Sequence, residues 1–218
     1  MNKSILFIVD KFYPTDEIFI EEVYANMIPS RGYKASFVMR CNVNNIQLPD
    51  KWHNNNIFFV SNEMSTSNPI IRIFNLSCSA FQIYKIIKNN NFDIVQIRNW
   101  PWALLVASKL KNIFSFKLVF QRSYPINDLR KETIKRMKGI TRILQTLRND
   151  FWHKKTISLM RYCDAIFPVS EEMKSAMEKE GVNEKLMIPI PYGCTNPPIV
   201  QDSEVEDLRK QYQLIGKE

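Results

Sequence analysis

Short apolar runs alternate along the chain with segments in which apolar residues recur at helical spacing. A continuous apolar run of this kind is typical of a strand that is covered on both faces. The alternation of such strands with helices predicts an α/β fold, a Rossmann-like parallel sheet flanked by helices. The runs that predict strands are residues 4–9, 35–39, 57–60, 92–97, 116–121, 164–170 and 185–190.

Helical periodicity fills most intervals between these strands. Residues 16–27 are expected to form a helix with Ile18, Val23 and Met27 facing inward and with Gly32 closing the turn beyond it. The other predicted helices are residues 68–88, entered through Asn68 and Pro69, residues 101–110, residues 128–155 and the segment after Ser170, whereas residues 41–56 are a predicted surface loop.

Composition narrows the class of protein. A chain of 218 residues with 45% hydrophobic residues is long enough to bury the core of one domain, and its net charge of +8 favours an anionic partner. The four cysteines are far apart and form no metal-binding or redox motif, so no metal is expected. Asp10 ends the first apolar run too early for a signal peptide or a membrane span, which favours a cytoplasmic location.

Ligands of open parallel sheets bind at the carboxyl ends of the strands, so the residues that follow each strand are the candidate site. The first such loop, DKFYPTDE, contains no glycine, which argues against a dinucleotide site. The candidates at the strand ends are Asp10 and Lys11, Arg98 and Asn99, Arg122 and Ser123, and Ser170 and Glu171.

Two interpretations remain open for several of these residues. Arg98 and Arg122 could converge as a fork for phosphate or carboxylate, or each could pair with an acid such as Asp10 or Glu171. Ser170 is placed to cap the N-terminus of a helix, a local role that explains it without a ligand.

The segment 128–155 has nine basic residues against three acidic ones. Its apolar residues recur at helical spacing, which predicts one amphipathic helix. Such a helix could lie on an anionic membrane or pack against its own domain, and no RNA-binding signature accompanies it, so nucleic acid is not an expected partner. The apolar positions are Ile134, Met137, Ile140, Leu144, Leu147 and Phe151, and the candidate membrane-surface residues are Lys131, Lys135, Arg136, Lys138, Arg142 and Arg148.

Two long stretches carry a family resemblance: FYPTDEIFIEEVYANMIPSRGYKASFV and RYCDAIFPVSEEMKSAMEKEGVNEKLMIPIPYGC. The first is similar to the opening of family 4 glycosyltransferases, and the second resembles a later segment of that family in order and spacing. FDIVQIR and KLVFQRS lie where the family has its fourth and fifth strands. The chain departs from the family in three ways: the family's donor-binding domain is absent, Arg122 stands where a histidine is common, and the first loop lacks glycines.

The resemblance implies the N-terminal half of a GT-B fold, in which two Rossmann-like domains face each other across a cleft. Residues 1–190 would be the acceptor-side domain, and residues 191–218 a proline-rich linker and a helix, capped by Ser203 and Glu206, that lead to a donor-binding domain outside this chain. The residues at the strand ends would face the cleft.

The implied activity is the transfer of a sugar, with retention, from a nucleotide-sugar to a glycan or a lipid-linked acceptor. It needs no metal or cofactor, and the nucleotide-sugar is a substrate held mainly by the other domain, so this chain alone is expected to be inactive. The alternative is a non-catalytic subunit that binds a membrane or a glycan and recruits a separate donor-binding chain. Either protein could be peripheral on the inner face of the membrane.

Overall fold

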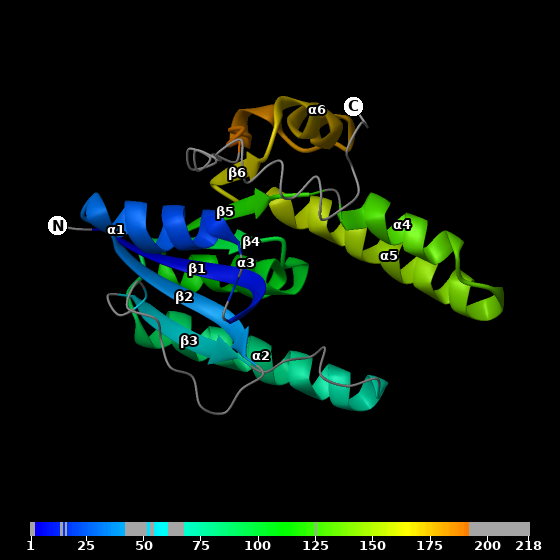
Figure 1. Ribbon diagram of the computed structural model, residues 1–218, viewed down its shortest axis with the longest axis horizontal. Helices are drawn as coiled ribbons and strands as arrows, with labels where there is room; N and C mark the ends of the chain where they lie inside the picture. The colour runs from blue at the N-terminus through cyan, green and yellow to red at the C-terminus, as the bar shows by residue number, and fades with distance from the viewer. Residues whose placement is uncertain are drawn as a thin grey trace, which may run out of the picture.

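The computed structural model describes residues 3–13, 15, 17–41, 52, 55–60, 68–124 and 126–191. Within this part, strands form one parallel sheet in the order β3-β2-β1-β4-β5-β6, with helices on both faces (Figure 1). The strands are β1 (Ser4–Tyr13), β2 (Lys34–Cys41), β3 (Asn56–Val60), β4 (Ile94–Arg98), β5 (Lys117–Arg122) and β6 (Ala165–Pro168). The helices are η1 (Phe19–Met27), α1 (Ile28–Ser30), α2 (Pro69–Asn89), α3 (Pro101–Phe114), α4 (Ile126–Lys135), α5 (Gly139–Met160), α6 (Glu171–Lys179) and η3 (Glu184–Leu186).

The sheet separates two hydrophobic cores, as expected for strands that are covered on both faces. Leu6 and Ile8 of β1 pack in the larger core beneath α2, α3 and α5. Phe7, between them in the sequence, points to the other face and stacks on Tyr24 of η1, with ring centroids 4.2 Å apart. This alternation, which follows from the two-residue period of a strand, confirms the predicted Rossmann-like α/β fold.

The first helix differs from the predicted one in its buried face. Its residues Phe19–Met27 form a π-helix, in which hydrogen bonds join residues five apart rather than four. The wider turn buries Ile20, Tyr24 and Ala25, at spacings of four and one, and leaves Ile18 and Met27 exposed. The prediction that Ile18 and Met27 face inward is therefore wrong, whereas Val23 packs partly buried against the core, as predicted.

The predicted cap of α2 and the predicted glycine turn are confirmed. Asn68 caps α2, its side-chain oxygen accepting from the N–H of Ile70 at 2.9 Å, and Pro69 stands in the first turn. Gly32 adopts a φ of 86°, as expected for a glycine that closes a turn. Most of the predicted loop 41–56, the linker after residue 191 and the helix over 203–214 lie outside the described residues.

Residues 185–190 do not form the expected strand. They begin in the short 3-10 turn η3, and only Met187 bridges to Ile166 of β6. The N–H groups of Ile188 and Ile190 donate to carbonyls of β6 at 2.9 and 2.8 Å. The segment therefore follows the sheet edge through these two hydrogen bonds, and the N–H that Pro189 lacks would point away from β6.

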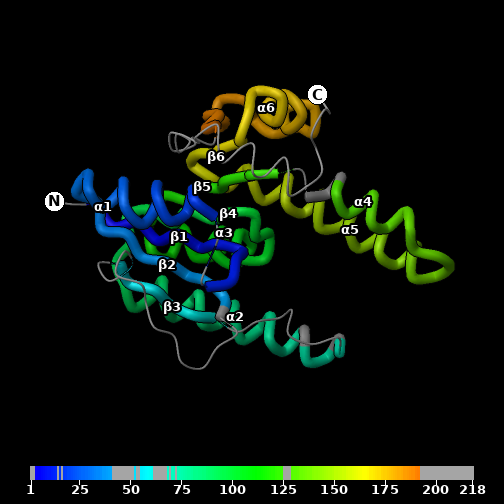
Figure 2. Tube along the Cα trace, in the orientation of Figure 1, coloured from blue at the N-terminus to red at the C-terminus, as the bar shows by residue number. Residues whose placement is uncertain are grey.

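The basic segment is two helices rather than one. The chain turns at Arg136 and Met137, and α5 begins at Gly139 with a φ of 60°. A residue in this left-handed region cannot continue a right-handed helix. The two helices form a hairpin that extends beyond the sheet (Figure 2). No helix of the described residues is long and apolar enough to cross a bilayer.

Candidate functional site at the carboxyl edge of the sheet

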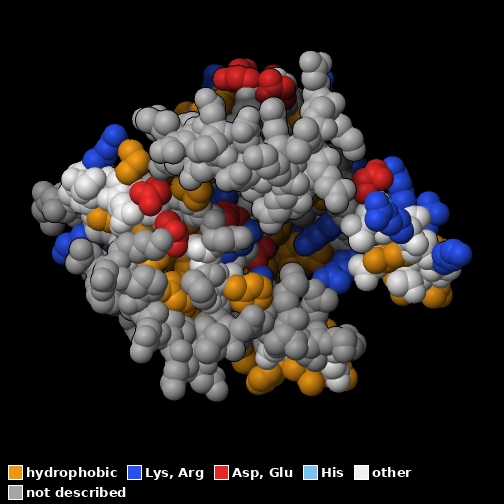
Figure 3. All heavy atoms as spheres, in the orientation of Figure 1, with side chains coloured by type: hydrophobic (Ala, Val, Ile, Leu, Met, Phe, Trp, Pro, Cys, Tyr) orange, Lys and Arg blue, Asp and Glu red, His pale blue; other side chains and the backbone are white. Residues whose placement is uncertain are grey.

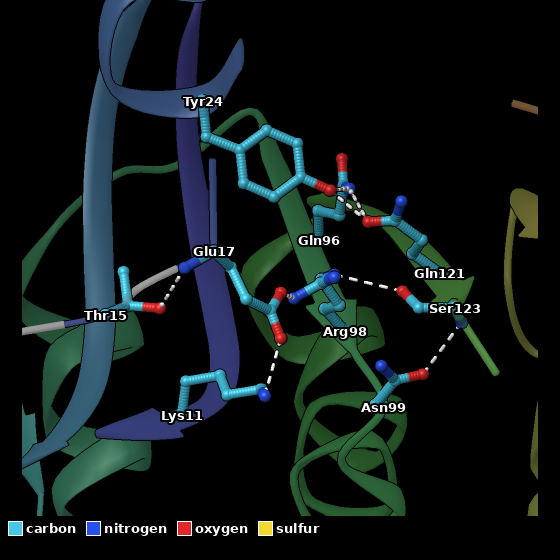
Figure 4. A network of polar contacts seen from close by, with 9 residues as sticks. All are labelled: Lys11, Thr15, Glu17, Tyr24, Gln96, Arg98, Asn99, Gln121 and Ser123. Carbon is cyan, nitrogen blue, oxygen red and sulfur yellow. Dashed lines mark hydrogen bonds and ion pairs between the residues drawn. The ribbon is translucent and has the colours of Figure 1, made fainter. Parts of the chain in front are cut away.

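Glu17 organises a polar network at the carboxyl ends of β1 and β4 (Figure 4). It lies between β1 and η1, and its carboxylate forms ion pairs with Lys11, at 2.6 Å, and with the guanidinium of Arg98. The Arg98 side chain is only 4% exposed, whereas 36% of the Lys11 side chain is exposed. The hydrogen bond to Glu17 is the main cause of a raised pKa of Lys11, which keeps this amine charged.

The ends of β4 and β5 are tied together next to this network. The Nε of Arg98 donates to the hydroxyl of Ser123 at 3.0 Å, and the N–H of Ser123 donates to the side-chain oxygen of Asn99 at 2.8 Å. Asn99 adopts a φ of 55°, a conformation that asparagine tolerates better than most residues. All three side chains are buried, so the network has a fixed geometry.

Polar side chains also lie behind the network, between the sheet and η1. Gln96 donates to the hydroxyl of Tyr24 at 2.6 Å and to the side-chain oxygen of Gln121 at 3.2 Å, and the Tyr24 hydroxyl donates to the same Gln121 oxygen. The two glutamines interrupt otherwise apolar strands at buried positions. That interruption is the signal in the sequence that marks this polar layer.

Asp10 lies beside the network but has its own partner. Its carboxylate pairs with Arg40 of β2 at 2.5 Å, and the Arg40 guanidinium lies 4.4 Å from the ring centroid of Trp100. Tyr124 follows β5 at the same edge, where burial, followed by the charge of Asp10, raises the pKa of its phenol. The phenol therefore remains a neutral hydrogen-bonding group at physiological pH.

Arg98 and Arg122 do not converge. Arg98 stands opposite Gln121 in the β4–β5 register, so the next residue, Arg122, points to the other face of the sheet. There it pairs with Glu180 at 3.2 Å, and His153 contacts the same carboxylate at 3.1 Å. Of the two interpretations left open, the fork is thus wrong, and each arginine pairs with an acid, although the acids are Glu17 and Glu180 rather than Asp10 or Glu171.

Arg122 lines a shallow, open hollow between the sheet edge and the helical hairpin. Arg130 of α4, with Trp152 and His153 of α5, completes much of its wall, and Asn99 joins the hollow to the network around Glu17. Polar groups of the site therefore continue from one face of the sheet edge to the other.

Ser170 and Glu171 lie apart from this constellation. The Ser170 hydroxyl accepts from the N–H of Met173 at 3.2 Å, which confirms the predicted helix cap. Hydrogen bonding to Ser170 also lowers the pKa of Glu172, while Glu171 is exposed in the first turn of α6. No group of three or more His, Cys, Asp and Glu side chains in the described residues could hold a metal ion.

The structure therefore joins Lys11, Arg98, Asn99 and Ser123 of the predicted candidates in one network. Asp10 lies beside it, Arg122 on the opposite face, and Ser170 and Glu171 elsewhere. The central residue, Glu17, was missed because its position in the glycine-free loop before the first helix resembles an ordinary acidic helix start. A fixed carboxylate beside an accessible ammonium can orient a ligand that carries hydroxyl or phosphate groups.

No family model and no curated protein matches the chain. Among solved structures, HepE of Anabaena in complex with UDP-glucose is 14% identical, with a TM-score of 0.55 over 98% of this chain and 50% of that chain. Sucrose-phosphate synthase from Thermosynechococcus elongatus is 12% identical, with a TM-score of 0.65 over 97% of this chain and 53% of that chain. A glycosyltransferase from Rickettsia africae is 17% identical, with a TM-score of 0.54 over 99% and 51%.

These similarities define the class of fold. The chain has the fold of one Rossmann-like half of the GT-B glycosyltransferases, as the sequence resemblance implied. It spans about half the length of the HepE chain.

Proposed function

We propose that this chain is the acceptor-side, N-terminal domain of a retaining glycosyltransferase of the family 4 type. The enzyme would transfer a sugar from a nucleotide-sugar to a glycan or a lipid-linked acceptor, without a metal or another cofactor. The observation that carries the proposal is the Glu17 network, which lies at the carboxyl edge of a half GT-B sheet, where ligands of such sheets bind.

The geometry suits the binding of an acceptor. Two cations hold the Glu17 carboxylate in one orientation, and its remaining lone pairs can accept a hydrogen bond from an acceptor hydroxyl. Lys11, one-third exposed beside it, can donate to a second oxygen of the same ligand. In this role Glu17 and Lys11 position the acceptor, and Arg98 and Ser123 fix Glu17 from behind.

The proposal assigns residues 1–190 to the acceptor-side domain and residues 191–218 to a linker and a helix that lead to a donor-binding domain. The fold match to about half of the HepE chain supports this division. That structure contains UDP-glucose, a nucleotide-sugar, and we extend a donor of this chemical class to the present protein. The donor-binding half would act in the same chain or as a partner chain, and residues 1–218 alone would be inactive.

Turnover of nucleotide-sugars tests this proposal. The chain would be assayed alone and together with its donor-binding half, with release of the nucleoside diphosphate as the readout. We expect turnover only when both halves are present, and a loss of at least about tenfold for Glu17→Gln, because the amide binds neither cation as an ion pair. The matched control is Glu178→Gln on the exposed face of α6. A complete protein that turns over no nucleotide-sugar would refute the proposal.

We also propose that the hairpin of α4 and α5 binds the inner face of an anionic membrane. Ile140, Leu144, Leu147 and Phe151, which were predicted to form an apolar stripe, are each at least 60% exposed. The basic candidates Lys131, Lys135, Arg136, Lys138, Arg142 and Arg148 are exposed as well. An exposed apolar stripe flanked by basic residues is typical of helices that lie in a membrane interface.

This exposed stripe also favours the second candidate function, a non-catalytic subunit that docks a membrane or a glycan and recruits a donor-binding chain. Co-sedimentation with phosphatidylglycerol vesicles tests the membrane contact, and it should weaken as salt is raised. Purification of the native protein then separates the two functions. A donor half in the same chain supports the enzyme, whereas a separate chain without transfer activity supports the subunit.

A further inference from the structure

The outer face of α2 carries a second exposed apolar stripe, which matches that of α5 in spacing. Both stripes follow the pattern i, i+3, i+4, i+7 and i+11 along a long helix. In α2 the positions are Ile70, Ile73, Phe74, Ser77 and Phe81, and in α5 they are Ile140, Ile143, Leu144, Leu147 and Phe151. The apolar members are between 56% and 77% exposed. Neither stripe is needed for the core, since other faces of both helices bury the residues that pack on the domain.

The two stripes belong to one layer of helices. α3 contacts both α2 and α5 on the same face of the sheet. At its start, the indole N–H of Trp102 donates to the carbonyl of Leu76 in α2, at 3.2 Å, and its ring packs on Trp152 of α5, with centroids 5.9 Å apart. The half-buried Trp102 thus bridges the two helices where each carries its stripe. Figure 3 shows hydrophobic side chains along the lower side of both α2 and the hairpin.

The positive charge of the protein is concentrated on the same elements. Residues 69–89 contain three basic residues and no acidic one, and residues 126–160 contain nine basic residues and three acidic ones. These two segments therefore carry a net charge of +9, so the rest of the chain carries −1. On α2, Lys85 lies 4.7 Å from the ring centroid of Phe81, directly beside the stripe.

We propose that the stripes of α2 and α5 together form one docking surface for an anionic lipid bilayer. The proposal rests on the membrane contact proposed above for the hairpin and adds α2 as a second, independent contact. Charge complementarity favours an anionic bilayer at this surface. The basic residues that border both stripes attract anionic headgroups, while the apolar side chains enter the interface. A protein partner fits less well, because seven of the twelve basic residues in these two segments are lysines, which are depleted at protein interfaces.

This surface would also orient the site. α2 begins at the carboxyl end of the sheet after β3, and α5 begins at the tip of the hairpin beyond the same end (Figure 1). Contact along both stripes would hold that edge beside the bilayer, with Arg122 on the same face of the sheet as the stripes and the Glu17 network on the opposite, η1 face. A lipid-linked acceptor would reach the network past this edge.

The test measures vesicle binding of the chain by co-sedimentation, with phosphatidylglycerol vesicles and with phosphatidylcholine vesicles. One variant combines Ile70→Ser, Ile73→Ser and Phe74→Ser in α2, and another combines Ile140→Ser, Ile143→Ser and Leu144→Ser in α5. We expect each triple variant to bind phosphatidylglycerol vesicles at least about tenfold more weakly, because three apolar side chains no longer enter the interface. The matched control is Ile113→Ser on α3, since Ile113 is 68% exposed but lies outside both stripes.

A second readout does not depend on the stability of these variants. An environment-sensitive dye on Ser77→Cys should shift to the blue when phosphatidylglycerol vesicles are added, in a chain that carries Cys41→Ala, Cys78→Ala and Cys194→Ala and keeps the buried Cys163. The same dye on Ile113→Cys should not shift.

Distinct outcomes overturn the inference and the proposal it rests on. If only the α5 variant loses binding and the dye at position 77 does not shift, α2 is no membrane contact, although the hairpin contact stands. If the unmodified chain binds neither kind of vesicle, both membrane proposals are wrong. The proposed acceptor role is then still tested separately, by the turnover of nucleotide-sugars. If the chain self-associates or binds its donor half through α2, and the α2 variant abolishes that contact, the stripe is a protein interface and the inference is wrong.

Discussion

Glu17 shows how a single carboxylate can fix the edge of a sheet. It draws Lys11 of β1 and Arg98 of β4 to one point, and Arg98 in turn holds Ser123 after β5. A carboxylate between two cations is rigid because each ion pair restricts the other. At the scale of residues, the site therefore depends more on the partners of Glu17 than on any single strand end.

The contacts of Arg98 should contribute to the free energy of unfolding. Arg98→Met removes a buried guanidinium and leaves the Ser123 hydroxyl and one side of Glu17 without their partner. We expect a loss of about 2 kcal/mol in the free energy of unfolding, less than for a fully buried pair because Glu17 keeps Lys11. Denaturant unfolding measures it, with Lys109→Met on the exposed face of α3 as the control. A loss equal to that of the control would contradict the structural role of Arg98.

Asp164 should make stability depend on pH. Burial raises the pKa of its carboxyl, but hydrogen bonds from Lys111 and from the N–H of Leu118, at 2.8 Å each, outweigh burial and hold the pKa below the ordinary value of 3.8. Since the folded state binds the proton more weakly than the unfolded state, Asp164 stabilises the fold above the unfolded pKa. This stabilisation is lost as pH falls through the folded pKa.

Replacing the carboxylate tests that dependence. Asp164→Asn should be less stable than the unmodified chain at pH 7, by about 1 kcal/mol. Between roughly pH 5 and pH 3 its stability should fall less steeply, because one of the shifted carboxylates is gone. Thermal unfolding across this range measures the effect. Parallel pH profiles for the two proteins would show that Asp164 contributes nothing to acid sensitivity.

The sequence predicted local roles of residues better than contacts between distant ones. Ser170 and Asn68 were recognisable as caps because a cap depends only on the few residues that follow it. The faces of Arg98 and Arg122 depend on the register of β4 against β5, which local pattern does not determine. The partner of Arg98 comes from a loop 81 residues earlier in the chain, and nothing local marks it.

At the scale of elements, the hairpin of α4 and α5 depends on one glycine. The continuous apolar pattern over residues 128–155 predicted a single helix, and the turn before Gly139 divides it. Ile134 on α4 is thereby buried, while the apolar residues of α5 between Ile140 and Phe151 stay exposed. Hydrophobic periodicity located both helices but could not show which stripe packs, because that depends on the direction in which the chain turns.

Substitutions of Gly139 should destabilise the protein to the extent that the new residue disfavours the left-handed backbone conformation. A Cβ at this position would meet no atom within 4 Å, so the expected penalty is conformational rather than a clash. We expect Gly139→Ala to destabilise the protein by about 1–2 kcal/mol, and Gly139→Asn by less, because asparagine adopts this conformation more readily. Denaturant unfolding of both variants measures the order, and an alanine variant as stable as the asparagine variant would contradict it.

The first helix explains another limit of sequence-based prediction. Its position was predicted within a few residues, but its buried face was not, because a π-helix is rare and has no composition signal of its own. Tyr24, which this face buries, carries the contact to Gln96 and Gln121 behind the site. The helix type thus affects the site as well as the core.

At the scale of the whole molecule, the strand pattern was sufficient to predict the fold, and the fold places the network where an acceptor is expected in the proposed enzyme. Charge is also unevenly distributed in the molecule, since α2 and the hairpin carry a net charge of +9 and the rest of the chain −1. Under our proposals, one side of the domain contacts the membrane and the adjacent sheet edge receives the acceptor. Donor chemistry would then belong to the other half of the GT-B fold.

Steady-state kinetics of Glu17→Gln in the protein that contains both halves test this division of labour most directly. If the chain is the acceptor-side domain, the variant should raise KM for the acceptor or lower kcat, by at least about tenfold in kcat/KM, and leave KM for the nucleotide-sugar unchanged. Glu178→Gln should change neither. An increase in KM for the nucleotide-sugar, with acceptor kinetics unaltered, would place the donor at this edge and contradict the account.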